Sequence, residues 1–392
     1  MSAWEFPLTE TTLGEEEREA ALRVLDRKWL SMGPEVEAFE QEFAAATGAP
    51  HAVAVSNGTA ALELAYQAVG LRCGDRIALP ALTFVAALNA ALRLGLEPVL
   101  LDIESPLDLT PSNAALERAL ARAPGLRAVV SMPYGGWAPR MAELADLRRA
   151  HGLALVEDSC HAVLATLGGR SLGTFGDAGT FSFFPNKNMT TGEGGMVATP
   201  RADVAERLRR LRSHGMTTMT WDRERGHAHS YDVVAAGTNA RMDEIRAAIG
   251  RAQLAKLPAA NASRRESAAW LARGLSARTG GALAFPFHEG PPRPADETPS
   301  AHLLVALLPE GHDRARFREA LAERRVQSSM HYPPLYTFTH ARELLAAEAA
   351  HCPVLESVRA RLVTLPLAPG WTEQRRERLA ELVADAFTAS AR

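Results

Sequence analysis

Cysteine is scarce in this sequence, and the three residues present are far apart. Cys73, Cys160 and Cys352 are odd in number and lie in unrelated segments. A disulfide framework needs paired cysteines, and a structural zinc site needs closely spaced pairs of ligands. The pattern therefore favours reduced thiols and predicts no metal site.

Long apolar runs and strongly charged tracts are missing as well. No run approaches the roughly 18 apolar residues that a membrane-spanning helix needs. The acidic start, MSAWEFPLTETTLGEEE, lacks the charged-then-apolar pattern of a signal peptide. The net charge is −3, with acidic and basic residues interspersed, which argues against nucleic acid or a membrane surface as a partner. We expect a cytoplasmic protein.

Lysine is the scarcest charged residue. Lys28, Lys187 and Lys256 stand against forty arginines. Codon bias in a GC-rich genome accounts for the ratio, and it makes each remaining lysine more informative. An arginine keeps its proton and cannot form a Schiff base, whereas a lysine amine can.

What the sequence does contain is an α/β pattern. From about residue 52 to 200, short apolar runs (HAVAVS, RIALP, PVLLDI, RAVVSM, LALVED) alternate with helical stretches, and GTFSFF and GGMVAT follow as two more strands. Continuous apolar runs between helices indicate strands buried on both faces. We therefore predict a mostly parallel, doubly wound sheet with its ligand site at the carboxyl ends of the strands.

The rest of the chain predicts a second, smaller domain. We expect a loop over 216–230, helices over 242–257 and 261–275, and a Pro/Gly-rich surface segment over 285–300. A strand over 302–308 and helices over 313–325 and 372–389 follow. This pattern predicts a large α/β domain over 1–254 and a small α+β domain over 255–392.

Three segments carry candidate chemistry. In FSFFPNKNMTTGEGG, Lys187 follows an apolar strand and precedes a Thr/Gly-rich turn. In LALVEDSCHA, Asp158 and His161 stand at the end of a strand, where a carboxylate can pair with a protonated pyridine nitrogen. In SNGTAALELA, Gly58 and Thr59 open a helix whose N–H groups can bind a phosphate. Taken singly, each has an ordinary alternative: a solvated lysine, a turn-capping aspartate and a common N-cap.

Together these segments carry a family resemblance. The chain resembles the DegT/DnrJ/EryC1/StrS aminotransferases, which have the aspartate aminotransferase fold (fold type I) and use pyridoxal 5'-phosphate. The resemblance covers nearly the whole chain, including LDRKWLSMGPEVEAFE, SNGTAALELA, PALTFVAALNA, VEDSCHAVLA, FSFFPNKNMTTGEGGMVAT, GTNARMDEIRAAIGRAQL, MHYPPLY and TLPLAPGWTEQ.

The resemblance assigns roles to particular residues. Lys187 corresponds to the lysine that forms the Schiff base with the cofactor and shuttles the proton. Asp158 corresponds to the partner of the pyridine nitrogen, and His161 lies where the family has Gln or His near the ring's 3-hydroxyl. Other positions correspond to cofactor contacts: Phe84 for ring stacking, Gly58, Thr59 and Ser182 for the phosphate, and Asn239 for the phosphate of the neighbouring subunit. The resemblance therefore implies a homodimer with shared active sites.

The sequence departs from the family pattern at positions near the expected substrate site. Ser159 and Cys160 follow the Glu-Asp pair where the family usually has two small residues, and Thr238 and Ala240 flank Asn239 where aromatics are frequent. Candidate substrate contacts are Arg241, His331 and Tyr332, each of which could equally be structural. Trp29 and Trp221 are further candidates, for which burial in the core is the commoner use. The altered pattern leaves the keto substrate open.

The resemblance implies transfer of an amino group from glutamate or glutamine to a keto-sugar, nucleotide-linked or not, or to a ketocyclitol. One alternative is a sugar dehydratase of the same family, a branch that carries His in place of the lysine. Another is a catalytically silent sensor, in which loss of the lysine or of the aspartate is expected. Lys187 and Asp158 argue against both.

Overall fold

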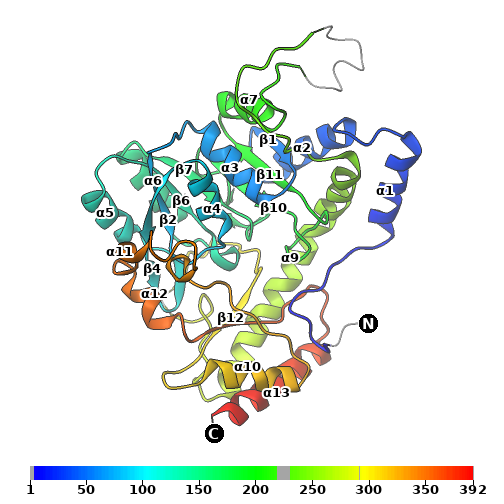
Figure 1. Cartoon of the computed structure of the whole chain (residues 1–392). Helices are drawn as coiled ribbons and strands as arrows, with labels where there is room; N and C mark the ends of the chain where they lie inside the picture. The colour runs from blue at the N-terminus through cyan, green and yellow to red at the C-terminus, as the bar shows by residue number, and fades with distance from the viewer. Residues whose placement is uncertain (1–3, 219–229, 291, 392) are drawn as a thin grey trace.

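A computed structural model describes residues 4–218, 230–290 and 292–391. Figure 1 shows a large sheet with helices on both faces, above a smaller layer that holds the carboxyl terminus. The predicted loop over 216–230 falls mostly outside the described residues, and so does Trp221.

Within the described residues, seven strands form the central sheet in the order β1-β11-β10-β7-β6-β2-β3. β11 is antiparallel to both of its neighbours, and the β10–β7, β7–β6, β6–β2 and β2–β3 pairs are parallel. The predicted, mostly parallel doubly wound sheet is confirmed. Its strands are β1 His51–Val55, β2 Arg76–Pro80, β3 Glu97–Leu101, β6 Leu126–Ser131, β7 Ala154–Asp158, β10 Ala178–Ser182 and β11 Gly195–Thr199.

Side chains alternate between the two faces of this sheet, as the pleat requires. Val53 and Val55 pack in one hydrophobic cluster and Ala52 and Ala54 in another. The helices α3 Gly58–Ala68, α4 Ala86–Arg93 and α7 Ala202–Leu211 cover the first face. The opposite face is covered by α5 Asn113–Arg122 and α6 Met141–Ala150 on one half and by α2 Pro34–Thr47 on the other. The sheet is thus buried on both sides, which places a ligand at its strand ends.

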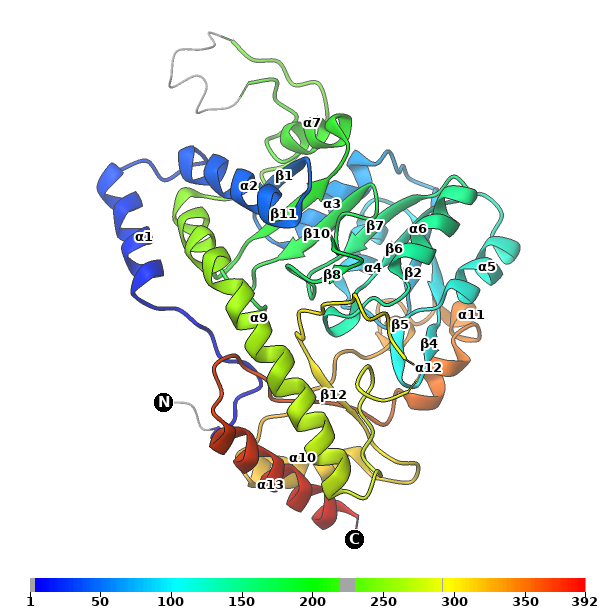
Figure 2. The same ribbon diagram turned by 180° about the vertical axis from the view of Figure 1, so that it is seen from behind.

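One long helix, α9 Glu244–Arg278, connects the two layers (Figure 2). The prediction of separate helices over 242–257 and 261–275 is therefore wrong. Pro258 lies inside the helix and removes only one backbone N–H from the hydrogen-bond ladder. Leu254 and Leu257 pack in the core under the large sheet, and Leu271 packs in the core of the smaller layer. Burial at both ends offsets the local cost of the proline, about 3 kcal/mol.

The smaller layer is built around a two-stranded antiparallel sheet. β12 Leu304–Leu307 pairs with β13 Leu362–Leu365, and α10 Arg314–Glu323 and α13 Glu373–Ser390 pack against it with the end of α9. Phe6, from the amino-terminal segment, is buried in the same core. The domain boundary at 254/255 falls within α9, and the division into two domains stays a prediction.

The segment between these two strands returns to the large sheet. It contains the short helices η2 Leu335–Thr337, α11 Ala346–Ala349 and α12 Pro353–Val358. The Asp102 carboxylate accepts the N–H groups of Val354 and Leu355 at 2.8 and 2.9 Å, and Leu335 donates its N–H to the carbonyl of Ala81. These bonds hold the segment 331–358 over the strand ends.

The remaining elements lie at the periphery. α1 Glu15–Arg27 stands beside α9 at the edge of the molecule (Figure 1). Two small hairpins and one short turn complete the element order. The hairpins are β4 Ile103–Ser105 with β5 Asp108–Pro111 and β8 Thr166–Leu167 with β9 Arg170–Ser171, and the turn is η1 Tyr134–Gly136. In the part of the chain that the structure describes, no helix combines the length and apolar character needed to cross a membrane.

Candidate active site

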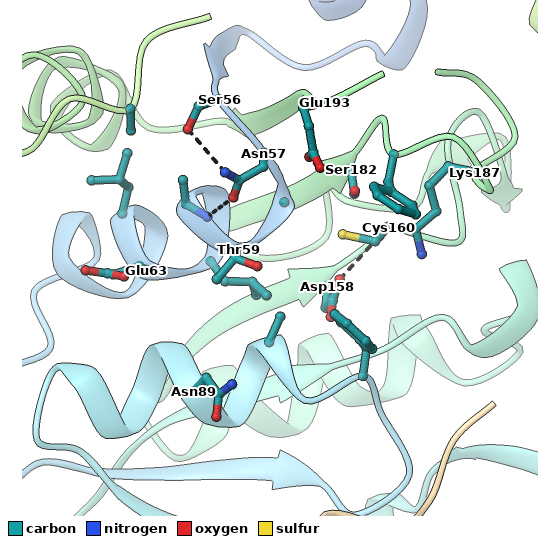
Figure 3. Close-up of a pocket in the computed structure, with 18 of the residues that line it drawn as sticks. Ser56, Asn57, Thr59, Glu63, Asn89, Asp158, Cys160, Ser182, Lys187 and Glu193 are labelled. Atoms are coloured by element: carbon teal, nitrogen blue, oxygen red, sulfur yellow. Dashed lines mark hydrogen bonds between the residues drawn. The ribbon is translucent and has the colours of Figure 1, made fainter. Parts of the chain in front are cut away.

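A cavity of about 740 Å³ opens at the carboxyl ends of β1, β7 and β10. Its wall is formed by the start of α3, the loop before α4 and the turns after β7 and β10, with residues 238–240 and Tyr332 at its edge. In Figure 3, Asp158, Cys160 and Lys187 lie together, and Glu63 and Asn89 lie away from them. The volume is within the range of small-molecule sites.

The amino terminus of α3 forms one wall. Asn57 caps the helix, its side-chain oxygen accepting the N–H of Ala60 at 2.8 Å. A Cβ atom at Gly58 would lie 2.7 Å from Cβ of Ser182, so only glycine fits where α3 meets β10. Thr59 is exposed in the cavity wall. The first N–H groups of a helix lack intrahelical partners and favour an anion.

Lys187 reaches the cavity from the turn after β10. Its backbone N–H bonds to the carbonyl of Phe184 at 2.9 Å, and Phe183 accepts the N–H of Thr191. The next residue, Asn188, is buried and donates from Nδ2 to Oδ1 of Asn261 and to the carbonyl of Ser300 at 2.8 and 2.9 Å. The turn is therefore fixed to α9 and to the entry of β12, while the side chain of Lys187 is left in the cavity.

The amine of Lys187 and the carboxylate of Asp158 face the same space. Burial lowers the pKa of Lys187, against the opposing effect of Cys160 and Asp158, and burial raises the pKa of Asp158, opposed by a hydrogen bond from Cys160 and by Lys187. In the described chain the Lys187 amine has no hydrogen bond or ion pair. A lysine in this state is a good nucleophile and base.

His161 is buried and also lines the cavity. Its Nδ1 accepts the N–H of Gly135 at 3.3 Å, and its Nε2 lies 2.9 Å from the hydroxyl of Tyr332. The ring of Tyr332 is 5.4 Å from that of Phe84, measured between ring centroids. Phe84 is 48% exposed, an unusual value for a large apolar side chain, and it lines the cavity.

The structure brings most of the residues predicted for the site together. The predicted residues that line the cavity are Gly58, Thr59, Phe84, Asp158, His161, Ser182, Lys187, Asn239 and Tyr332. Asn239 is exposed at the cavity edge of its own chain, next to Ala240, whose carbonyl accepts the N–H of Ser56. Its assignment to a neighbouring subunit is not tested by a single chain.

Three of the candidate substrate residues lie outside the lining of this cavity. Trp29 lies against Gly33, near Glu244. Arg241 is half-buried, and its pKa is lowered by burial and by Arg212. His331 is buried and pairs through Nδ1 with the hydroxyl of Thr364 at 2.9 Å. None of the three lines the cavity of this chain, and their contacts with a substrate stay untested.

Other residues of the site were not anticipated from the sequence. Asn57 and Glu193 line the cavity, and so does Phe184, whose ring is 46% exposed. The N-cap position of Asn57 could have been found from the strand–turn–helix pattern. The buried link from Asn188 to Asn261 joins residues 73 apart in the chain, and no local pattern signals it.

Comparisons with known proteins identify a family and several relatives of the whole chain. A family model described as the DegT/DnrJ/EryC1/StrS aminotransferase family matches residues 11–384. The chain is 34% identical over 387 residues to the spore coat polysaccharide biosynthesis protein SpsC of Bacillus subtilis (strain 168), covering 97% of this chain and 96% of that protein. It is 32% identical over 365 residues to the UDP-N-acetyl-3-dehydro-alpha-D-glucosamine 3-aminotransferase of Acidithiobacillus ferrooxidans, covering 92% and 91%. The crystal structure of the aminotransferase TlmJ from Streptoalloteichus hindustanus superposes with a TM-score of 0.86 at 32% identity, covering 98% of this chain and 99% of that one.

Proposed function

The chain belongs to the DegT/DnrJ/EryC1/StrS aminotransferase family, and we propose that it holds pyridoxal 5'-phosphate at Lys187 and aminates a keto-sugar. The expected family and the aspartate aminotransferase-like fold are confirmed, and pyridoxal phosphate is the cofactor of this family. The observation that carries the proposal is the Lys187 amine, which is unpaired within the described chain and shares its cavity with the buried Asp158.

The residues present fit the cofactor. Gly58 lets the start of α3 pack closely against Ser182, and the free N–H groups at the start of α3 suit a phosphate. The Ser182 and Thr59 hydroxyls line the same end of the cavity. Asp158 supplies a carboxylate for a pyridine nitrogen, and the exposed ring of Phe84 offers a stacking surface. We assign these roles together with Lys187.

When bound, the cofactor supplies an electron sink for the carbon that loses or gains a proton. The chain's part is to hold and move that proton. The Lys187 amine lies in the cavity with its pKa lowered by burial, and it is placed to act as a general base and then as a general acid. Asp158 would pair with the pyridine nitrogen and so orient the ring, and the contacting rings of Phe84 and Tyr332 line one side of the cavity.

For the substrates we propose glutamate or glutamine as the amino donor and a keto-sugar, nucleotide-linked or not, as the acceptor. Support comes from the relative from Acidithiobacillus, which is named for a UDP-linked keto-sugar, and from SpsC, named for polysaccharide biosynthesis. The outer wall of the cavity carries Glu63, Asn89 and Arg93, which are suitable partners for hydroxyl groups. A ketocyclitol has the same hydroxyl chemistry and belongs to the same test.

A single-turnover experiment tests the proposal. The pyridoxamine form of the enzyme is mixed with keto-sugar nucleotides, free keto-sugars and ketocyclitols, and the return of the yellow pyridoxal form is followed by absorbance. We expect rapid conversion with at least one keto-sugar, and amination of that compound by mass spectrometry. If a simple keto acid reacts and no keto-sugar or ketocyclitol does, the assignment of the acceptor is wrong, and a reaction with a ketocyclitol alone selects that alternative. Colourless protein that takes up no cofactor contradicts the proposed function itself.

We further propose that the enzyme is a homodimer in which Asn239 completes the phosphate site of the neighbouring subunit. The exposed position of Asn239 at the cavity edge supports this, because its amide is free to face a second chain. A two-fold axis near this segment presents it reciprocally to both sites. The competing arrangement is that Asn239 serves the cavity of its own chain, whose wall it borders.

Subunit complementation separates the two arrangements. Lys187→Ala subunits are mixed under exchange conditions with Asn239→Asp subunits, whose added carboxylate repels a phosphate. If Asn239 acts across the interface, the mixed dimer has one site with an intact lysine and an intact asparagine. Equal mixing then restores about a quarter of the wild-type activity, since half of the dimers are mixed and one of their two sites is whole. Each variant alone is the control. No recovery in demonstrably mixed dimers, or a monomer by light scattering, contradicts the proposal.

A further inference from the structure

The hydrogen bonds of His161 determine which of its nitrogens carries the proton. The backbone N–H of Gly135 points at Nδ1 from 3.3 Å. A backbone N–H can only donate, so Nδ1 must present its lone pair. If the ring is neutral, its hydrogen is then on Nε2, the nitrogen 2.9 Å from the hydroxyl of Tyr332.

The surroundings keep this ring neutral. His161 is 2% exposed, and its pKa is well below the usual value because of burial, with Lys187, His302 and His331 acting in the same direction. The ring of His302 lies 4.2 Å away between centroids. Nδ1 of His302 has its own hydrogen-bond partner, Oδ1 of Asn188 at 2.8 Å. Both Nδ2 hydrogens of Asn188 are donated elsewhere, so its oxygen is the acceptor.

The fixed tautomer has a consequence for Tyr332. Since Nε2–H donates to the Tyr332 oxygen, the hydrogen of the hydroxyl cannot point back at His161. Within the described residues that hydroxyl has no other hydrogen-bond partner. Tyr332 lines the same cavity as Lys187 and contacts Phe84. The hydroxyl hydrogen is therefore left without a partner in the described chain, on a residue that lines the cavity proposed for the substrate.

We propose that His161 is a positioning residue and that the hydroxyl of Tyr332 donates a hydrogen bond to the oxygen next to the reacting carbon of both substrates. The inference rests on the proposed function. An amino acid carries a carboxylate oxygen on the carbon beside the one that exchanges the amino group, and a keto-sugar carries a hydroxyl at the equivalent place. One fixed donor thus serves two substrates of different shape.

Three substitutions test the hydrogen bond from His161 to Tyr332 and the donor role of the Tyr332 hydroxyl. Tyr332→Phe removes the donor and should raise KM for both the amino donor and the keto substrate about three- to tenfold, with a smaller change in kcat. His161→Gln keeps an N–H donor at the position of Nε2 and should retain most of the wild-type affinity. His161→Asn keeps an acceptor near Nδ1 but loses that donor, and should match Tyr332→Phe. Combining His161→Asn with Tyr332→Phe should add little, because both changes break one element.

The matched control is Tyr336→Phe, which removes a tyrosine hydroxyl bonded to Glu356 at 2.9 Å, outside the cavity lining. It should leave KM unchanged for both substrates. Unchanged KM values in Tyr332→Phe, or multiplicative losses in the double variant, overturn the inference while the wild-type enzyme still transaminates. Wild-type protein without any transamination overturns the proposed function instead.

The tautomer can also be read without any turnover. In full-length protein labelled with ¹⁵N-histidine, the signals lost in His161→Gln identify His161, and their shifts distinguish a protonated from an unprotonated ring nitrogen. We expect a neutral ring with hydrogen on Nε2 that persists across neutral pH. A proton on Nδ1, or an imidazolium at neutral pH, overturns the inference even if the variants at this position fold poorly.

Discussion

Lys187→Ala is expected to abolish overall transamination while the protein stays folded. The amine has no hydrogen bond or ion pair within the described chain, so its loss leaves no structural partner unsatisfied. Its chemistry cannot be replaced, because the neighbouring Asn188 and Thr190 are neutral side chains whose polar atoms already hold the turn. General acid–base catalysis by a positioned side chain contributes about 10²- to 10⁴-fold, and loss of the covalent link adds to that. Steady-state rates, circular dichroism and the melting temperature check the two parts of the prediction.

The covalent link can be located directly. Borohydride reduction of the cofactor-loaded enzyme, followed by peptide mapping, should mark Lys187. The chain provides its own controls in Lys28 and Lys256, the other two lysines. Lys256 already pairs with Glu17 at 2.5 Å and with the carbonyl of Thr12, and Lys256→Ala should leave activity intact. A label on Lys28 or Lys256 would falsify the assignment of the site.

The central sheet could be predicted because its information is local. Each buried strand is a short apolar run such as RIALP, and the sequence prediction of that strand and the observed β2 Arg76–Pro80 coincide. The candidate site was accessible for the same reason. Asp158 is the last residue of β7, and Gly58 and Lys187 follow the ends of β1 and β10. Parallel strands bring their carboxyl ends to one edge.

What could not be predicted depends on contacts between distant segments. Pro258 lies between the two predicted helices, and its local cost is visible in the sequence, whereas the burial of α9 in two cores is not. The bonds from Asp102 to Val354 and Leu355 bring back a segment some 250 residues away, and with it Tyr332. His161 and Tyr332 are 171 residues apart. A tautomer, finally, depends on the partner of each ring nitrogen, which only the folded chain provides.

Asp158 is a carboxylate in a buried position, where its ionised form costs free energy. The residue is 2% exposed at the end of β7, and burial raises its pKa above the usual value. A group whose pKa is raised on folding stabilises the protein below its unfolded pKa, and that stability is lost as the pH rises through the folded value. Without a cofactor, the ionised form at neutral pH therefore carries a cost that a bound pyridinium can offset.

Asp158→Asn is accordingly expected to slow both half-reactions by about a hundredfold or more, because the carboxylate no longer holds the proton on a pyridine nitrogen and the ring becomes a poorer electron sink. The same change removes the ionised group, so the melting temperature of the cofactor-free variant at neutral pH should not fall below that of the wild-type protein. Addition of cofactor should raise the melting temperature less in the variant than in the wild type, since the bound state has lost its charge partner. Stopped-flow absorbance measures the half-reactions, and thermal unfolding with and without cofactor measures the melting temperatures.

The matched control is Asp203→Asn, which changes an exposed carboxylate on α7 and should change none of these quantities. Single-turnover rates close to wild type in Asp158→Asn, or an equal stabilisation by the cofactor, would show that the carboxylate only shapes the turn after β7.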